Sequence, residues 1–324
     1  MSLAITLKSI GGPEMLQHSD IEVGMPTADW VRIKQTVAGV NFVDIYFRMG
    51  LYPLTGESSG LGLEGAGVVD AVGPEVRNLR VGDRVAYAGM PIGAYAEVRL
   101  LPESRLLRIP DDIGDRVAGS MMLRGLTAQM LLRKVYQVAA GDWLLVHAAA
   151  GGLGQILTRW ARALGANVIG TTGSAAKIKM IEAAGANAVL LNNDPGWVAQ
   201  ARQIAGGKGV HFAIDGIGGD MLARSIAAVR PFGTAASVGQ PAGPIPPIRV
   251  EELGGGRAIA LVRPSVIAYA NDPEFYQAGA QDLFAAIRDG LSQPSVAEYA
   301  LRDARQAHED LEAGRTTGSV MLTI

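Results

Sequence analysis

The sequence predicts an α/β protein in which a doubly wound parallel sheet is combined with a second, smaller β-rich domain. Two observations lead to this prediction. Between residues 121 and 264, short apolar strands alternate with helical stretches and short connections. Before residue 120, short strands follow one another with glycine and proline between them, a pattern typical of an antiparallel, barrel-like domain.

The β-rich domain is predicted to occupy the first 120 residues. In residues 31–37, apolar residues alternate with polar ones, as expected for a strand with one face in water. Further strands are predicted at 65–72, 81–88 and 94–100. The tail from about residue 265 to residue 324 contains two helices closed by Gly290 and Gly314 and a last strand at 319–324. We expect this tail to return to the first domain.

The parallel sheet is predicted from the apolar strands of the middle segment. These strands lie at 143–147, 167–171, 188–191, 210–215 and 234–239. Helices are predicted at 119–136, 155–164, 175–184, 197–205 and 219–229. In such sheets ligands bind beyond the carboxyl ends of the strands, so the functional residues are expected there.

Composition excludes several classes of protein. The 324 residues are 48% hydrophobic and 19% charged, which is enough apolar surface for two cores. The formal net charge of -2 argues against binding to nucleic acid or to an anionic membrane surface. The absence of cysteine removes disulfides, thiolate nucleophiles and Cys-ligated metal centres. No secretory signal or apolar run of about 20 residues is found, so we expect a cytoplasmic location.

The turn after strand 143–147 predicts a dinucleotide-binding site. Its sequence is Ala148-Ala149-Ala150-Gly151-Gly152-Leu153-Gly154, and a helix follows. Small residues allow backbone N–H groups and the helix N-terminus to approach a pyrophosphate, and a further glycine allows close helix packing. Ala149 stands where the usual motif has its first glycine, so the motif is a variant. The alternative is a glycine-rich loop that only permits close packing. The predicted cofactor contacts here are Ala149, Gly151, Gly152, Leu153 and Gly154.

The residues after the second strand favour NADPH over NADH. NAD-specific folds carry an acidic residue about 20 residues beyond the glycine motif, but none occurs between Asp142 and Glu182. A carboxylate would repel a 2′-phosphate, whereas Lys177 can form a charge-assisted hydrogen bond with it. The alternative for Lys177 is an ordinary solvated lysine. The predicted contacts in this segment are Thr172, Gly173, Ser174 and Lys177.

Several further segments together resemble a known family. They are Asn41 to Tyr46 with Gly50 to Pro53, Gly62 to Gly67, Gly82 to Val85, Gly125 to Ala128, and Arg263 to Ser265. Over nearly the whole chain, they are similar to the zinc-independent medium-chain dehydrogenases/reductases, and within these to the zeta-crystallin-like NADPH:quinone oxidoreductases. The resemblance implies a GroES-like catalytic domain over 1–120, a Rossmann domain over 121–264, and a return segment over 265–324.

The same resemblance implies a protein without zinc. Zinc-dependent relatives have a cysteine where Asn41 stands and a histidine where Leu63 stands, and they use further cysteines for structural zinc. Zinc stabilises the alkoxide that forms on an alcohol substrate, so plain alcohols are not expected as substrates here. A quinone or an enone delocalises the incoming charge itself. We therefore predict metal-free hydride transfer from NADPH to a quinone.

Four residues are given roles by resemblance. Asn41 and Tyr46 are expected beside the nicotinamide and the acceptor, where Asn41 offers an uncharged amide donor. Tyr52 is expected to line the substrate cleft, and Thr127 to lie near the nicotinamide ribose. The alternatives are a turn amide for Asn41, half-buried barrel residues for the tyrosines, and capping or packing for Thr127.

Two more cofactor residues are predicted at strand ends. Asn192, followed by Asn193, replaces a tyrosine that in NADPH-specific relatives often stacks on the adenosine. Gly239 ends the predicted strand at 234–239. Dimers of the family join their dinucleotide domains edge to edge, and the apolar segment 258–262 can serve as that edge, so a homodimer is expected.

The other ionisable residues are not assigned to catalysis. No spacing forces Asp44 and Glu64 together, and Glu64 is interpreted as structural. The four histidines are scattered, and His147 and His211 fall in predicted buried strands, where hydrogen-bonded core histidines are common.

Two alternative functions remain open. One is an NADPH-dependent reductase of activated C=C bonds in enals or enones. The other is a cofactor-bound RNA-binding or structural protein like the crystallin relatives, against which the near-neutral charge and the lack of a basic, aromatic-rich patch count.

Overall fold

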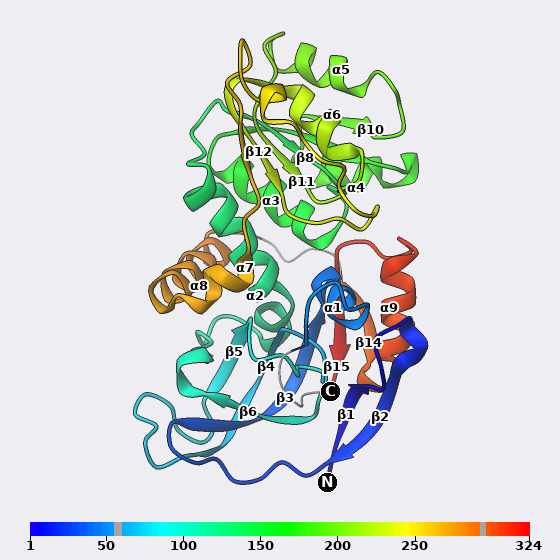
Figure 1. Cartoon of the computed structure of the whole chain (residues 1–324). Helices are drawn as coiled ribbons and strands as arrows, with labels where there is room; N and C mark the ends of the chain where they lie inside the picture. Colours follow the sequence, from blue (N-terminus) through cyan, green and yellow to red (C-terminus); the bar gives the residue numbers. More distant parts are fainter. Residues whose placement is uncertain (55–59, 292–295) are drawn as a thin grey trace. The chain divides into compact units, whose positions relative to one another are not determined.

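The computed structural model describes residues 1–54, 60–291 and 296–324, which form two compact units (Figure 1). Unit 1 contains Met1–Leu126, Val266–Ile287 and the residues from 296 onward. Unit 2 contains Thr127–Ser265 and residues 288–291. The chain therefore begins in unit 1, passes through unit 2, and returns to unit 1.

The main sheet of unit 1 has seven strands and is mostly antiparallel. Its central strand β3 pairs with β4, β6 and β15. Val31 and Ile33 of β3 are fully buried while Arg32 between them is half-buried, which confirms the predicted alternation. The strands, in order across the sheet, are β14 (Val296–Ala300), β15 (Ser319–Thr323), β3 (Trp30–Val40), β4 (Glu64–Val72), β5 (Arg84–Ala88) and β7 (Leu107–Arg108), with β6 (Val98–Pro102) also on β3.

Unit 1 also contains a separate antiparallel pair and several helices. The pair is β1 (Ser2–Leu7) with β2 (Leu16–Ile21). The helix α2 runs on into a π-helical segment at Met130–Val135 in unit 2. The helices are α1 (Phe42–Arg48), α2 (Asp115–Gln129), α7 (Val266–Asn271), α8 (Pro273–Arg288) and α9 (Ala304–Glu312).

Unit 2 is built on a six-stranded parallel sheet. Its strand order is β10 (Ala188–Leu191), β9 (Asn167–Thr172), β8 (Trp143–Val146), β11 (Val210–Asp215), β12 (Val229–Ser237) and β13 (Ala260–Val262). The helices are α3 (Gly152–Ala163), α4 (Ile178–Ala183), α5 (Trp197–Ile204) and α6 (Met221–Ala228). The chain runs outward in one direction from β8 to β10 and then in the other from β11 to β13. This confirms the predicted doubly wound sheet, with its switch point between β8 and β11.

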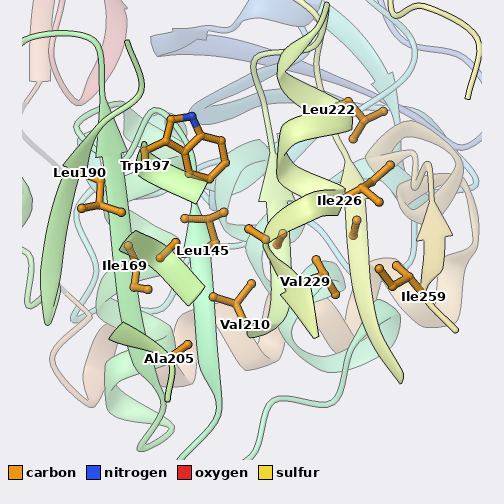
Figure 2. Packing of buried hydrophobic residues seen from close by; sticks show 14 residues of the cluster. Leu145, Ile169, Leu190, Trp197, Ala205, Val210, Leu222, Ile226, Val229 and Ile259 are labelled. Atoms are coloured by element: carbon orange, nitrogen blue, oxygen red, sulfur yellow. The ribbon is translucent and has the colours of Figure 1, made fainter. Parts of the chain in front are cut away.

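The core of unit 2 explains why the sequences of these strands are mostly apolar. Leu145, Ile169 and Leu190, from three neighbouring strands, belong to one buried cluster that also contains Trp197 of α5 and Ile226 of α6 (Figure 2). The residues that flank Leu145 on β8 are also fully buried. Both faces of the strand are therefore covered, as is usual in parallel sheets.

Some predicted element limits were wrong. Strand β5 begins at Arg84 rather than residue 81, because Gly82 adopts a positive φ of 94° in a turn. Residues 94–97 bond to several different segments, through Tyr95 N to Leu61 O and Glu97 N to Leu3 O, so the strand predicted at 94–100 is β6 at Val98–Pro102. Strands β1, β2 and β14 were not predicted.

Candidate active site

The turn after β8 has the geometry required at the N-terminus of α3. An added Cβ on Gly154 would lie 2.5 Å from the carbonyl oxygen of Ala148 and 2.6 Å from Cα of Ala149, so only glycine fits this close contact. Gly151 precedes the helix, and no side chain caps it. The first backbone N–H groups of α3, on Gly152 to Gly154, have no acceptors within the helix itself. Such a helix end fits an anionic phosphate.

Ala149 is positioned by the neighbouring strand. Its N–H donates to the carbonyl oxygen of Thr171 at 3.0 Å, and its side chain is fully buried. Leu153, in the first turn of α3, is half-buried. The variant first position of the motif is therefore filled by a small residue that packs into the sheet, as a glycine would.

The segment after β9 forms a tight turn that contains the residues predicted for the 2′-phosphate. The hydroxyl of Thr172 accepts a hydrogen bond from Ser174 N at 3.2 Å, so it shapes the turn. Asn192 N donates to Thr172 O at 3.0 Å, which places the end of β10 beside this turn. Gly173 is exposed, and Ser174 and Lys177 are half-buried. The structure thus brings these predicted residues together at one edge of the sheet.

The turns after β11 and β12 meet at the same edge. Asp215 Oδ1 accepts hydrogen bonds from Ile217 N at 2.8 Å and Gly218 N at 2.9 Å. An added Cβ on Gly218 would lie 2.5 Å from Cα of Gln240, next to Gly239. Gly239 is therefore part of a close contact between two turns.

The residues predicted for catalysis gather around α1 in unit 1. Asn41 directly precedes α1 and is 7% exposed, and Tyr46 on α1 is 8% exposed. Tyr52 lies edge-to-face with Tyr46, with ring centroids 5.5 Å apart, and Tyr52 N donates to Tyr46 O at 3.2 Å. Tyr52 also contacts Phe47 edge-to-face at 5.6 Å. Thr127, in contrast, belongs to α2 at the start of unit 2 and is half-buried.

Asn41 is held by a buried ion pair between Glu64 and Arg124. Its side-chain Nδ2 donates to Glu64 Oε1 at 2.8 Å, and Arg124 Nη1 donates to the same oxygen at 2.9 Å. Leu123 N donates to Glu64 Oε2 at 2.7 Å. Since a carboxylate accepts only, Asn41 must direct its amide nitrogen to Glu64. One of its two side-chain N–H bonds is thereby used, which limits the donor role predicted for Asn41.

Asp44 and Glu64, for which no spacing indicated proximity, both bind Asn41. Asp44 Oδ2 accepts from Asn41 N at 2.8 Å and from the hydroxyl of Tyr95 at 2.9 Å. Burial raises the pKa of Asp44 to about 7, against the lowering effect of these hydrogen bonds. Asn41 is therefore both a helix-capping residue and the link between two carboxyl groups.

A second buried cluster continues from Tyr95. Its hydroxyl lies 3.0 Å from Nε2 of His308, and Nδ1 of His308 lies 3.2 Å from Nη1 of Arg48. Arg48 forms a bidentate ion pair with Glu312 at 2.7 and 2.8 Å. Burial lowers the pKa of His308 to about 3, so the imidazole is neutral at pH 7. Sequence reasoning missed this cluster because its members come from α1, α9 and a loop.

The remaining histidines show no catalytic arrangement in the part of the chain that the structure describes. His147 is buried and bonded, as interpreted, and the half-buried His211 accepts a hydrogen bond from Trp143 N at 3.0 Å. Within the described residues, no three His, Asp or Glu side chains form a group that could hold a metal ion. No helix in residues 1–54, 60–291 and 296–324 is long and apolar enough to cross a bilayer.

Two family models match the chain. The model described as alcohol dehydrogenase GroES-like domain matches residues 27–111, and the model described as zinc-binding dehydrogenase matches residues 152–277. The first match lies in unit 1 and the second mainly in unit 2. These matches agree with the predicted GroES-like and dinucleotide-binding folds.

Similar proteins cover the chain almost completely. A quinone oxidoreductase of Pseudomonas aeruginosa is 39% identical over 99% of both chains, and a 2-haloacrylate reductase of a Burkholderia species is 38% identical over 99% of both. The crystal structure of Escherichia coli quinone oxidoreductase complexed with NADPH matches with a TM-score of 0.95 at 36% identity, covering 99% of this chain and 100% of that one. The chain therefore belongs to the quinone oxidoreductase family of the medium-chain dehydrogenases/reductases.

Proposed function

We propose that this protein is an NADPH-dependent quinone oxidoreductase that works without a metal ion. The observation that carries the proposal is the arrangement around Asn41, whose neutral carboxamide is bound to the salt-bridged Glu64 at the position where, by the resemblance, zinc-dependent relatives have a cysteine ligand. The full-length similarity to quinone oxidoreductases supports it. When bound, NADPH supplies a hydride, and the reduction of a quinone to a hydroquinone also consumes one proton.

The roles of the residues follow from their hydrogen-bonding capacity. Asn41 keeps one side-chain N–H after its bond to Glu64, and we assign that N–H to a quinone oxygen, where it stabilises the negative charge that develops. Tyr46 and Tyr52 form an aromatic wall that orients a flat acceptor. Arg124 balances the charge of the Glu64 carboxylate that holds Asn41.

The cofactor is assigned to the carboxyl edge of the parallel sheet. We propose that the uncapped N-terminus of α3 holds the pyrophosphate, with contacts from Ala149, Gly151, Gly152, Leu153 and Gly154. Thr172, Gly173, Ser174, Lys177 and Asn192 would hold the adenosine 2′-phosphate end, and Thr127 and Gly239 the nicotinamide end. In this assignment the β-rich domain, predicted as 1–120 with 265–324, is catalytic and residues 121–264 bind the dinucleotide.

The reaction is tested by steady-state oxidation of NADPH with different acceptors. Naphthoquinone, benzoquinone, an alkenal and a 2-haloacrylate are compared under the same conditions. We expect the highest kcat/KM with a quinone. Preference for the alkenal or the haloacrylate would overturn the assignment in favour of a C=C reductase, the second candidate, which the similarity to a 2-haloacrylate reductase favours.

The cofactor preference is tested with a pair of lysine variants. Lys177→Ala is expected to raise KM for NADPH by roughly 10-fold or more and to leave KM for NADH unchanged, because a charge-assisted hydrogen bond contributes about 1.5–3 kcal/mol. The matched control is Lys179→Ala, in the same segment and exposed. Equal loss with both cofactors would contradict the assignment of Lys177 to the 2′-phosphate.

The absence of a metal has its own test. We expect elemental analysis of the purified protein to find no stoichiometric zinc, and activity to survive treatment with a chelator. Stoichiometric zinc together with turnover of a saturated alcohol would refute metal-free catalysis.

We also propose a homodimer in the cytoplasm, formed through the edge of the parallel sheet. β13 is the outermost described strand on its side of that sheet, and Ala260 on it is exposed. Phe232 is 84% exposed, although its N–H bonds to Ala258 O next to this edge. Ala260→Pro removes a backbone donor and should convert the dimer to a monomer in light scattering. A wild-type monomer would contradict the proposal.

A further inference from the structure

A buried chain of hydrogen bonds connects the carboxyl ends of three parallel strands in unit 2. His147 Nδ1 lies 2.7 Å from Thr171 Oγ1, and His147 Nε2 lies 2.9 Å from Ser225 Oγ. Ser225 Oγ lies 2.5 Å from Asp215 Oδ2. His147 follows β8, Thr171 lies on β9 and Asp215 ends β11, so the chain crosses the switch point of the sheet.

The chemistry of the groups sets the direction of each hydrogen bond. Ser225 has one hydroxyl hydrogen, and the 2.5 Å contact assigns it to the carboxylate of Asp215 rather than to Met221 O at 2.9 Å. His147 must then donate from Nε2 to Ser225 Oγ and accept from the Thr171 hydroxyl at Nδ1. Burial lowers the pKa of His147 to about 4, which agrees with a neutral imidazole.

Each end of this chain of hydrogen bonds is bonded to a turn of the candidate cofactor site. Thr171 accepts the N–H of Ala149 at its backbone oxygen, and His147 directly precedes Ala148, whose φ is 49°. Asp215 uses its other oxygen, Oδ1, to hold the N–H groups of Ile217 and Gly218. The four side chains are at most 4% exposed, so solvent cannot replace a lost partner.

We propose that His147, Ser225 and Asp215 are positioning residues for the dinucleotide: they hold the turns after β8, β9 and β11 in one register, so that the backbone groups of these turns meet the cofactor together. The inference rests on the proposed function only in placing NADPH at these turns. Backbone contacts to a ligand tolerate displacements of only about 0.5 Å, which is why such turns need a rigid support.

The test separates cofactor affinity from stability and from turnover. Ser225→Ala breaks this chain of hydrogen bonds at its centre and is expected to raise the Kd for NADPH about 10-fold, because the turns that meet the cofactor lose their common support and shift. The value of kcat at saturating NADPH should stay within about twofold, because the variant does not touch the reacting atoms. Ser225→Thr retains the hydroxyl and should restore most of the affinity.

The matched control is Ser120→Ala. Ser120 is also fully buried on a helix, and its hydroxyl donates to the carbonyl oxygen of Arg116, but it lies outside the chain of hydrogen bonds. Its variant should bind NADPH as the wild type does. If Ser225→Ala binds NADPH with the Kd of the control, the proposal is refuted whatever the melting temperature, because a purely structural role lowers the melting temperature alone.

Two further outcomes are informative. If Ser225→Ala does not fold, the nearly isosteric Thr171→Val removes the hydrogen bond between residue 171 and His147 instead. A Kd for NADPH that stays at the wild-type value in this variant then overturns the proposal. If the wild type binds NADPH but reduces no quinone, the proposed reaction fails while the Kd comparison still decides the role of Ser225.

Discussion

The contact between α3 and the turn that precedes it can be tested with a single methyl group. In Gly154→Ala the new Cβ would lie 2.5 Å from the carbonyl oxygen of Ala148. Carbon contacts normally lie near 3.5 Å, so the turn and the helix must separate by about 1 Å. Overpacking of this kind costs about 1–3 kcal/mol of folding free energy. A displacement of about 1 Å also costs up to about 100-fold in a positioned site.

The assays are thermal unfolding and direct titration with NADPH. We expect the melting temperature to fall by about 2 °C or more and the Kd for NADPH to rise by about 10-fold or more. The matched control is Gly256→Ala, in the same unit, where an added Cβ meets no atom within 4 Å. A Gly154→Ala protein with the melting temperature and Kd of this control would refute the tight contact.

Three further predictions concern stability. Trp197→Ala should cost about 3–5 kcal/mol in denaturant unfolding, because Trp197 is fully buried; a loss below 1 kcal/mol would contradict its central place in the core. Since burial raises the pKa of Asp44 from 3.8 to about 7, the folded protein retains a proton that the unfolded chain releases, so wild-type stability falls as the pH rises from 4 to 7. Asp44→Asn removes this pH dependence. The difference in unfolding free energy between the variant and the wild type should therefore grow by up to about 4 kcal/mol between pH 4 and 7; a difference that does not vary with pH would argue against a protonated Asp44. Arg48→Met should cost about 1.5–3 kcal/mol, because it removes the charged hydrogen bonds between the buried guanidinium and the partly exposed Glu312, and adding Glu312→Gln should recover part of the loss; an equally unstable double variant would show that the charge is not the cause.

Much of the parallel domain could be predicted because its strands carry a local signal. Strands β10 and β11 have the predicted limits, since each is an apolar run bounded by polar or glycine residues. Strand β14 was missed because its five residues are half-exposed or exposed and have no apolar run. Strand β12 begins at Val229 rather than residue 234. Val229 already pairs with Val210 of β11, and the register then shifts, so that the next pair joins Phe212 to Thr234.

The site could be predicted only where its residues are neighbours in the sequence. The turn from Ala148 to Gly154 and the segment after β9 have recognisable spacings. The bonds of Asn41 to Glu64 and of His147 to Ser225 join residues 23 and 78 positions apart, which only the completed sheets bring together. No local pattern encodes them, so the support of the site appears only in the structure.

The path of the chain has a consequence for how the protein is made. Strand β3 lies between β15 and β4, so one neighbour of an early strand is synthesised among the last residues. At roughly 5–20 residues per second, the emerging N-terminal sheet waits on the order of tens of seconds for that neighbour. Unit 2, whose strands all lie between residues 143 and 262, can complete its sheet on the ribosome first. The earliest part of the chain to emerge is thus the last to close, and its exposed edge is where nascent chains would need a chaperone.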